Sequence, residues 1–561
     1  MKGERRKRRL WPWLVVLAVL GGLTAYNYWP AEPDKIIISR ETTYILGPLN
    51  ADGTPNYVKY LDDKYAEGVT AENNAAPLLL RAFGPEILPA EIRAEALRRL
   101  NLPADMFDGN DAAYFTQWRD RAGWAKADAN GAGDANSSAF RERERNEPAD
   151  NTSLGDVRHM LLAGKVHPEF EGWLAGNAGP LELVRQAVAK DRFYLPLIST
   201  SNPPKMADAQ FVQSLGVLQD IAMALAARAV LKMTRDDRLG AWDDVLAIHR
   251  MAHLLGQMPM LVCQLVAFRV DEIAATAGIV LATYWPMDAT LARDILAKLN
   301  NFGPASDDVK SCDEYERFDF LDAAVGVSRG QTAILVAEPS AECGAVGCFV
   351  RVNPNQILRE TNSWLDRLIK PMRLPSSKER AEAFKAIDAE FKELAARAGR
   401  RATNLRVSLL KLGGRLSQSA MTNVISDMFV CWHLCSFAPF SEMEGHAKMT
   451  FEIEKLAIAL ACFHAEQGRW PGQLKELCPS LLKAIPADRF SEKPLIYRPS
   501  EKGYLLYSVG RNLRDDGGQC KRTVGGKVVN AGADDIAAEV KPVESASTPA
   551  EAASRPAASQ P

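Results

Sequence analysis

The sequence predicts a mostly α-helical protein with a single N-terminal transmembrane helix, a large all-helical extracytoplasmic body and a small α+β domain near the C-terminus. Three observations predict this fold class. Twenty uncharged residues follow a basic N-terminus, apolar residues recur at spacings of three and four along much of the chain, and two strand-like segments follow a long amphipathic helix near the end. With 561 residues, 47% of them hydrophobic, the chain is long enough for two or more packed domains.

The charge of the chain is unevenly distributed. Residues 1–9, MKGERRKRR, hold six basic groups and one glutamate, whereas the whole chain has a formal net charge of −2. The remainder is therefore acidic. An acidic surface binds nucleic acid poorly, because phosphate contacts need clustered Lys and Arg, so we expect no nucleic-acid partner.

The first predicted element is a membrane anchor over Leu10–Trp29. As a helix, LWPWLVVLAVLGGLTAYNYW would span about 30 Å, the thickness of one hydrocarbon core, and it carries aromatic residues at both ends. The basic tail over residues 1–9 predicts a cytoplasmic N-terminus. The expected location is therefore the inner (cytoplasmic) membrane, with a single pass and the body outside the cytoplasm.

A cleaved signal peptide is the alternative for this segment. The sequence Leu23-Thr24-Ala25 ends in a small residue, but the bulky Leu23 makes a poor cleavage site. No cysteine lies nearby to carry a lipid. We therefore favour a retained anchor.

The helical body is predicted over residues 30–442. Its longest periodic signal indicates two antiparallel helices over 211–262, joined by the link TRDDRLG, and LVAFRVDEIAATAGIVLATY indicates a third. Small and charged residues dominate 126–151, which predicts a flexible surface loop. Helices resume in SSKERAEAFKAIDAEFKELAARAGRRATNL and MTNVISDMFVCWHLCSF.

The nine cysteines leave at least one thiol unpaired. Cys343 and Cys348, in the loop ECGAVGC, are the best candidates for a disulfide, because disulfides persist outside the cytoplasm and two glycines let the loop close. Two unpaired thiols are the alternative, and the sequence leaves both open.

The α+β domain is predicted over residues 443–540. The segment EGHAKMTFEIEKLAIALACFHAEQGRWP indicates a long amphipathic helix that ends at Gly468, and KPLIYRPSEKGYLLYSVG indicates two strands with a tight link. A tail of mainly Pro, Ala, Ser and Glu follows over 541–561. It cannot form a core and is predicted to be disordered.

This C-terminal segment resembles the globular head of the type II secretion major pseudopilins. The resemblance rests on LAIALACFHAEQGRWPGQLKEL, IPADRFSEKPLIYRPSEKGYLLYSVGRNLRDDGG and ADDI, which follow the family's order of helix, corner, strands and calcium loop. The pseudopilin leader is absent, so the resemblance implies a borrowed head rather than a pilus subunit. The layout, with GPLNADG and YSVGRNLRDDGG, also resembles a group of uncharacterised membrane-anchored envelope proteins from planctomycete-type bacteria.

Two sets of residues in the helical body have spacings found in metal sites. His249 and His253 in HRMAH stand one helical turn apart, as two zinc ligands do, but the glutamate that zincins place after the first histidine is missing. In CWHLC, Cys431 and Cys435 share a helix face while His433 lies on another. We interpret both sets as structural. Likewise, the acids of DDRLGAWDD are interpreted as helix caps rather than as an acid–base pair.

The loop after the second strand, GRNLRDDGG, is the best candidate site. Asn512, Asp515 and Asp516 offer side-chain oxygens of the kind that calcium prefers, and two glycines let the chain fold around an ion. A plain Asp-Gly turn is the alternative for such residues.

A second acidic pair completes the prediction. Asp534 and Asp535 in ADDI stand where the pseudopilin motif has its closing acids, so the resemblance implies a calcium site. The basic residues Lys521, Arg522 and Lys527 offer another way to neutralise these acids. The predicted calcium ligands are Asn512, Asp515, Asp534 and Asp535.

We expect an interaction or scaffolding protein rather than an enzyme. The sequence contains no P-loop, Rossmann glycine set or G-x-S-x-G elbow. The expected partner is an unidentified envelope protein of a secretion or surface assembly. The alternative is an envelope hydrolase or metalloenzyme with a site in the helical body around His249 and His253.

Overall fold

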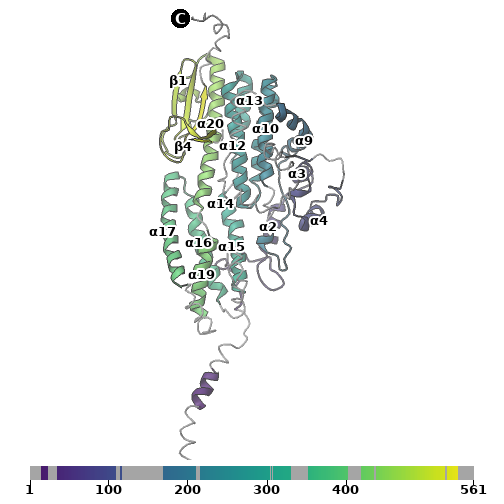
Figure 1. Cartoon of the computed structure of the whole chain (residues 1–561), viewed down its shortest axis with the longest axis vertical. Helices are drawn as coiled ribbons and strands as arrows, with labels where there is room; N and C mark the ends of the chain where they lie inside the picture. The colour runs from purple at the N-terminus through teal and green to yellow at the C-terminus, as the bar shows by residue number, and fades with distance from the viewer. Residues whose placement is uncertain are drawn as a thin grey trace, which may run out of the picture.

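The computed structural model of the chain is built mainly from helices (Figure 1). It describes residues 14–22, 34–108, 114–116, 168–209, 215–303, 305, 308–329, 352–401, 418–434, 437–524 and 527–540. The helical class of the prediction is confirmed, whereas its transmembrane part is not.

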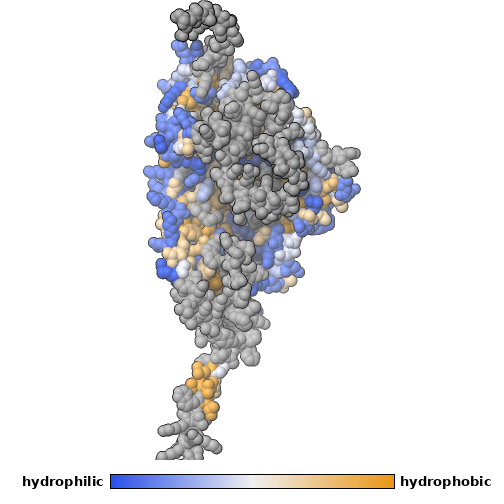
Figure 2. Space-filling view, viewed as in Figure 1, coloured by the Kyte–Doolittle hydropathy of each residue, from blue (hydrophilic) through white to orange (hydrophobic). Residues whose placement is uncertain are grey.

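The predicted membrane anchor is wrong. Within Leu10–Trp29 the structure describes a helix over residues 14–22, and nine residues rise only about 14 Å, less than half of a hydrocarbon core. The described ranges contain no helix that is both long and apolar enough to cross a bilayer. The described run is hydrophobic on its surface (Figure 2) but too short. The single-pass inner-membrane location depended on this anchor and is therefore not supported.

A layer of short helices precedes the bundle in sequence and packs beside it (Figure 1). Asn56 caps the first of them by accepting a hydrogen bond from the backbone N–H of Lys59, and the ring of Tyr57 stacks on Phe318 at 5.1 Å. The layer comprises α2 (Tyr57–Ala66), α3 (Ala76–Phe83), the 3-10 turn η1 (Pro85–Ile87), α4 (Ala90–Arg99), α8 (Pro168–Gly176), α9 (Ala178–Ala187) and the turn η2 (Met206–Asp208).

The centre of the molecule is a bundle of long helices, which we call the central bundle. It consists of α10 (Gly216–Thr234), α11 (Arg238–Leu255), α12 (Leu261–Tyr284), α13 (Ala289–Asn300) and α20 (Ala438–Gln467). The predicted antiparallel pair and third helix are confirmed as α10, α11 and α12. As interpreted, Asp237 caps α11, accepting from the N–H of Gly240 at 3.0 Å. Small residues such as Ala274 and Gly278 let α12 lie close against α20 (Figure 1).

A second helical region, the outer layer, has its own apolar core. It is formed by α16 (Pro354–Met372), α17 (Ser377–Arg401) and α19 (Gln418–His433). Leu365, Leu368, Phe384 and Val430 belong to its core, separate from the core of the central bundle. The two regions are joined through α14 (Asp308–Ser311), the π-helical turn η4 (Cys312–Glu316) and α15 (Arg317–Ser328).

The C-terminal head is built on α20, which ends at the left-handed Gly468 as predicted. An antiparallel sheet of order β1-β2-β5 packs on this helix, and a hairpin of β3 and β4 extends from it. The elements are η7 (Leu474–Leu477), β1 (Ile496–Ser500), β2 (Gly503–Ser508), β3 (Cys520–Val524), β4 (Lys527–Asp534) and β5 (Ile536–Val540). Buried Tyr504, Leu506 and Ala538 of the sheet share one apolar core with the central bundle.

Candidate metal centre

Two connections of the head bring three carboxylates together. Asp516 lies in the loop after β2, Asp534 is the last residue of β4, and Asp535 comes directly before β5. Because Ser508 at the end of β2 pairs with Ile536 at the start of β5, the two connections leave the sheet side by side. One oxygen from each carboxylate lies within 4.8 Å of the others. We call this group the acid cluster.

Backbone N–H groups orient two members of the acid cluster. Oδ2 of Asp534 accepts hydrogen bonds from the N–H groups of Arg511 and Asn512, both at 3.0 Å. Oδ2 of Asp535 accepts from those of Asp516 at 3.1 Å and Gly518 at 2.7 Å. These bonds hold both carboxylates rigidly against the loop after β2.

The loop needs glycine where it passes Asp534. Gly510 has a φ of 66°, and a Cβ there would lie 2.3 Å from the carbonyl oxygen of Asp534 and 2.5 Å from its Oδ1. Such contacts are sterically impossible, and a positive φ is itself unfavourable for other residues. The conformation that assembles the acid cluster therefore depends on Gly510.

The remaining oxygens of the two aspartates are unsatisfied. Oδ1 of Asp534 and Oδ1 of Asp535 are buried and have no hydrogen-bond partner among the described residues, and Asp535 is only 2% exposed. Burial, together with the nearby charges of Asp516 and Asp515, raises the pKa of Asp535 despite its backbone donors. Buried carboxylate oxygens normally have partners, so the two oxygens are suited to accept a proton or to bind a cation.

Asn512 lies at the rim of the acid cluster. Its Nδ2 donates to Oδ2 of Asp516 at 2.8 Å and to the carbonyl oxygen of Gly532 at 2.9 Å, while its Oδ1 accepts from the N–H of Arg514 at 2.7 Å. The side-chain amide therefore places a donor, not an oxygen, toward the cluster in this orientation.

Asp515, another predicted ligand, faces away from the acid cluster. Its Oδ1 accepts from the hydroxyl of Tyr507 at 2.7 Å and from the N–H of Gly517 at 2.9 Å, which lowers the pKa of Asp515. Asp516 takes its place in the cluster. The sequence offered both aspartates as oxygen donors. Only the path of the loop decides that Asp516 faces the acid cluster while its neighbour Asp515 faces Tyr507.

The chemistry of the acid cluster favours a hard cation. Its donors are carboxylate oxygens, with a backbone carbonyl and a carboxamide next to them, and such oxygen sets suit Ca²⁺ or Mg²⁺ better than Zn²⁺ or Cu²⁺. Calcium takes six to eight oxygens, so backbone carbonyls or water would have to complete its shell.

The acid cluster borders a groove of about 850 Å³ between α12, the start of α20 and the head. Asp534 and Asp535 belong both to the cluster and to the groove wall. Arg269, Glu272 and His446 line the facing side, together with apolar residues of α12. Anything that fixes the two aspartates therefore also fixes one wall of this groove.

The two histidines of the helical body do not converge on an ion. His249 is completely buried, and its two ring nitrogens lie 2.7 Å from Asp271 and 3.0 Å from Glu454. The ring nitrogens of His253 lie 2.8 Å from the carbonyl oxygens of His249 and of Gly303. The structural interpretation of both residues therefore stands.

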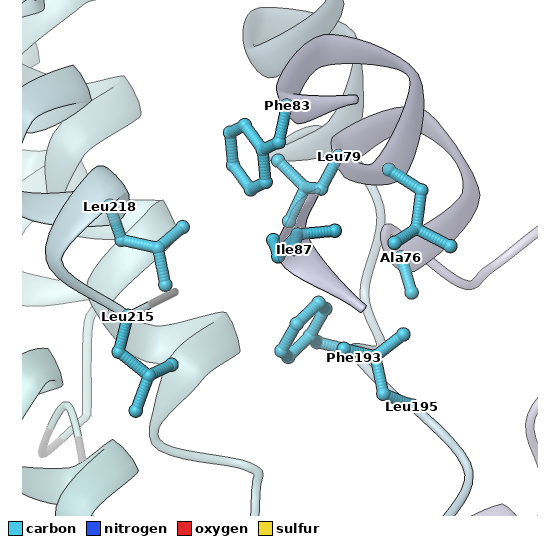
Figure 3. A pocket seen from close by; sticks show the side chains of 9 residues that line it. Ala76, Leu79, Phe83, Ile87, Phe193, Leu195, Leu215 and Leu218 are labelled. Carbon is cyan, nitrogen blue, oxygen red and sulfur yellow. The ribbon is translucent and has the colours of Figure 1, made fainter. Parts of the chain in front are cut away.

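A small cavity near α3 is lined by apolar side chains. It has a volume of about 20 Å³ and lies between α3 and the start of α10, where Leu79, Phe83 and Phe193 face Leu215 and Leu218 (Figure 3). This space is the size of one water molecule, and its wall is apolar.

Several predictions concern residues outside the described ranges. These are the disulfide between Cys343 and Cys348, the third member of CWHLC, Cys435, the loop over 126–151 and the tail over 541–561. The side chains of Lys521, Arg522 and Lys527 also fall outside them.

Comparison with known proteins gives no match: neither a family model, nor a curated protein, nor a solved structure matches this chain. The resemblance to pseudopilin heads and to planctomycete-type envelope proteins therefore stays an expectation.

Proposed function

We propose that this chain is an interaction or scaffolding protein whose C-terminal head is stabilised by a bound calcium ion. Asp516, Asp534 and Asp535 hold the ion. The observation that carries the proposal is the pair of buried carboxylate oxygens, on Asp534 and Asp535, that lack a partner among the described residues.

Calcium suits the acid cluster for two reasons. Three carboxylates this close together repel one another, and a divalent cation replaces this repulsion with attraction while satisfying the orphan oxygens. In addition, turning the Asn512 amide by half a turn would place its Oδ1, in place of Nδ2, beside Asp516 and the Gly532 carbonyl. The amide would then become a further ligand.

The ion links the loop after β2 to the start of β5 and thereby holds one wall of the groove beside α12. This role fits a protein that presents a surface to a protein partner. The alternative of an enzyme around His249 and His253 has no comparable support, because His249 is fully buried with both ring nitrogens engaged.

Thermal unfolding of the full chain with calcium, and with a chelator, tests the proposal. We expect calcium to raise the melting temperature by a few degrees, because a ligand that binds only the folded state stabilises it by about 2.7 kcal/mol at a hundred times its Kd. The double variant Asp534→Asn with Asp535→Asn should lose this shift.

Asp515→Asn is the matched control, since this carboxylate lies in the same loop but bonds Tyr507 instead of joining the acid cluster. It should keep the calcium shift. The proposal fails if the wild-type melting temperature is the same with calcium and chelator, or if the double variant responds as the wild type does.

A further inference from the structure

Two consecutive helices and a third from a distant part of the sequence meet at a buried charged group: His249 of α11, Asp271 of α12 and Glu454 of α20. Nδ1 of His249 lies 2.7 Å from Oδ1 of Asp271, and Nε2 lies 3.0 Å from Oε2 of Glu454. The side chains of His249 and Glu454 are fully buried and that of Asp271 is 10% exposed. The rings of Phe302 and Phe451 pack against the imidazole. We call this group the triad.

The geometry of the triad requires a proton. Each ring nitrogen of His249 faces a carboxylate oxygen, yet a neutral imidazole has a single N–H and two ionised carboxylates have none. Without an additional proton, a nitrogen lone pair would face a carboxylate lone pair in a site that excludes water. Burial opposes a charged ring, but Glu454 and Asp271 outweigh this effect and raise the pKa of His249 to about 10. The proton belongs to the triad as a whole.

The other charged groups around the triad are engaged elsewhere. Lys455, next to Glu454 on α20, pairs with Glu452 at 2.8 Å. Glu272, next to Asp271 on α12, pairs with Arg269 at 2.8 Å. On α11, the ring nitrogens of His253 lie against the carbonyl oxygens of His249 and of Gly303. The proton on the triad is therefore the positive charge that directly balances its two carboxylates.

The carboxyl group of Glu454 lies against α12 at Gly278, where the helix has no side chain. A Cβ at Gly278 would lie 1.8 Å from Oε1 of Glu454, so the carboxyl group occupies the space that any other residue at this position would fill. Oε1 itself is buried and has no hydrogen-bond partner among the described residues. Burial accordingly raises the pKa of Glu454, against the lowering effect of His249. Loss of the proton would leave two carboxylates here, with the charge of Lys455, which also pairs with Glu452, acting on Glu454.

We propose that the triad is a proton-dependent lock that holds α20, the helix on which the head is built, against α11 and α12. With the proton present, hydrogen bonds from His249 tie α11 to both neighbours. With the proton lost, repulsion between Asp271 and Glu454 favours separation of α20 from α12, since separation lets water reach Glu454. Because the sheet packs on α20, the lock controls how firmly the head and the groove wall are held.

The sign of the pH dependence follows from the raised pKa of His249. The stabilisation is complete below the ordinary histidine pKa of about 6.5 and is lost as the pH rises through about 10. Between these limits the folded chain holds one proton that the unfolded chain has released. The unfolding equilibrium constant should therefore increase about tenfold per pH unit from this proton alone.

Urea unfolding of the full chain between pH 6.5 and 9.5 (about three decades of proton activity) tests the lock, with a chelator present so that the calcium site plays no part. In the wild type, the triad should make the unfolding equilibrium constant rise about tenfold per pH unit. His249→Gln should lack this contribution. Glu454→Gln should shift the dependence to lower pH, because His249 loses its strongest partner. His464→Gln, on α20 but with a partly exposed ring, should match the wild type.

Hydrogen exchange provides an independent readout. In the wild type, the backbone amides of α20 near Glu454 should lose protection at pH 9.5 relative to pH 6.5, after correction for intrinsic rates, while those of α16 should not. Equal pH dependence of unfolding in the wild type and His249→Gln would overturn the proposal. If His249→Gln does not fold, two other results would overturn the proposal. One is a pH dependence of unfolding in Glu454→Gln equal to that of the wild type, and the other is equal protection of α20 at pH 6.5 and pH 9.5 in the wild type.

Discussion

The central bundle and the outer layer use the same kinds of charged residues in opposite ways. In the bundle, Asp244 is completely buried and paired with Arg228 and Lys232, and the triad is enclosed by aromatic rings. In the outer layer, ion pairs line a groove of about 620 Å³ that includes Arg367, Glu390 and Asp427. Hydrophilic residues form the outer edge on that side of the molecule, with hydrophobic residues between them (Figure 2).

The difference shows that exposure to solvent, rather than the number of ion pairs, sets how much each pair contributes to the free energy of unfolding. Exposed pairs gain little because water screens them and long side chains must be ordered. Enclosed pairs interact strongly, but each partner depends on the other, since removing one leaves an uncompensated buried charge. Three substitutions test how far the two regions differ.

The largest effect is expected for Asp244→Ala in the central bundle. Its carboxylate lies 2.7 Å from Arg228 and 2.8 Å from Lys232 and has no exposed surface, so its loss should lower the free energy of unfolding by about 3 kcal/mol. Asp427→Ala is the matched change in the outer layer. The side chain of Asp427 is itself only 6% exposed, but its partner arginines are 47% and 32% exposed and stay solvated without it, so the loss should be about 1 kcal/mol. Equal losses in urea unfolding would remove the distinction between the regions.

An intermediate effect is expected for Gly278→Ala. The new Cβ would overlap the carboxyl group of Glu454, so the variant should lose about 2 kcal/mol of unfolding free energy through overpacking and displacement of the triad. Gly399→Ala in α17 is the matched control: nothing lies within 4 Å of its Cβ position, and the higher helix propensity of alanine should stabilise by about 0.5 kcal/mol. A neutral Gly278→Ala would show that the helices separate more easily than their packing indicates.

The smallest effect is expected for Asp319→Asn in α15, between the two regions. Burial, followed by the charges of Glu316 and Asp322, raises the pKa of Asp319 to about 7. The folded chain thus keeps a proton that the unfolded chain releases near pH 4, and stability falls as the pH rises through about 7. Measured at pH 5 against pH 4, the variant should gain about 1 kcal/mol on the wild type, because the folded wild type keeps this proton over that pH unit. Glu390→Gln, with half of its carboxylate exposed, should show no such pH dependence.

Much of the fold was predictable from local patterns. The boundary between α10 and α11, the capping role of Asp237 and the end of α20 at Gly468 all follow from residues within one helical turn of the feature. The anchor over Leu10–Trp29 was inferred from apolar composition alone, whereas the described part of this segment is a helix over residues 14–22, and the described residues hold no helix able to cross a membrane. In the candidate site, the pairing of Asp534 and Asp535 with the loop after β2 was expected, but the choice of Asp516 over Asp515 was not.

By itself, the sequence determined the main helices, the first two strands of the head and the apolar face of each, but it did not indicate β3, β4 or β5. Tertiary structure alone decided that α20 lies against α12, and hence that Glu454 meets His249 across 205 residues of chain, while His249 also meets Asp271 of α12. The same holds for the acid cluster, where strand pairing brings Asp516 beside Asp535. The physical reason is that apolar periodicity specifies a face to be buried without specifying its partner, whereas a buried charge is stable only against one particular neighbour.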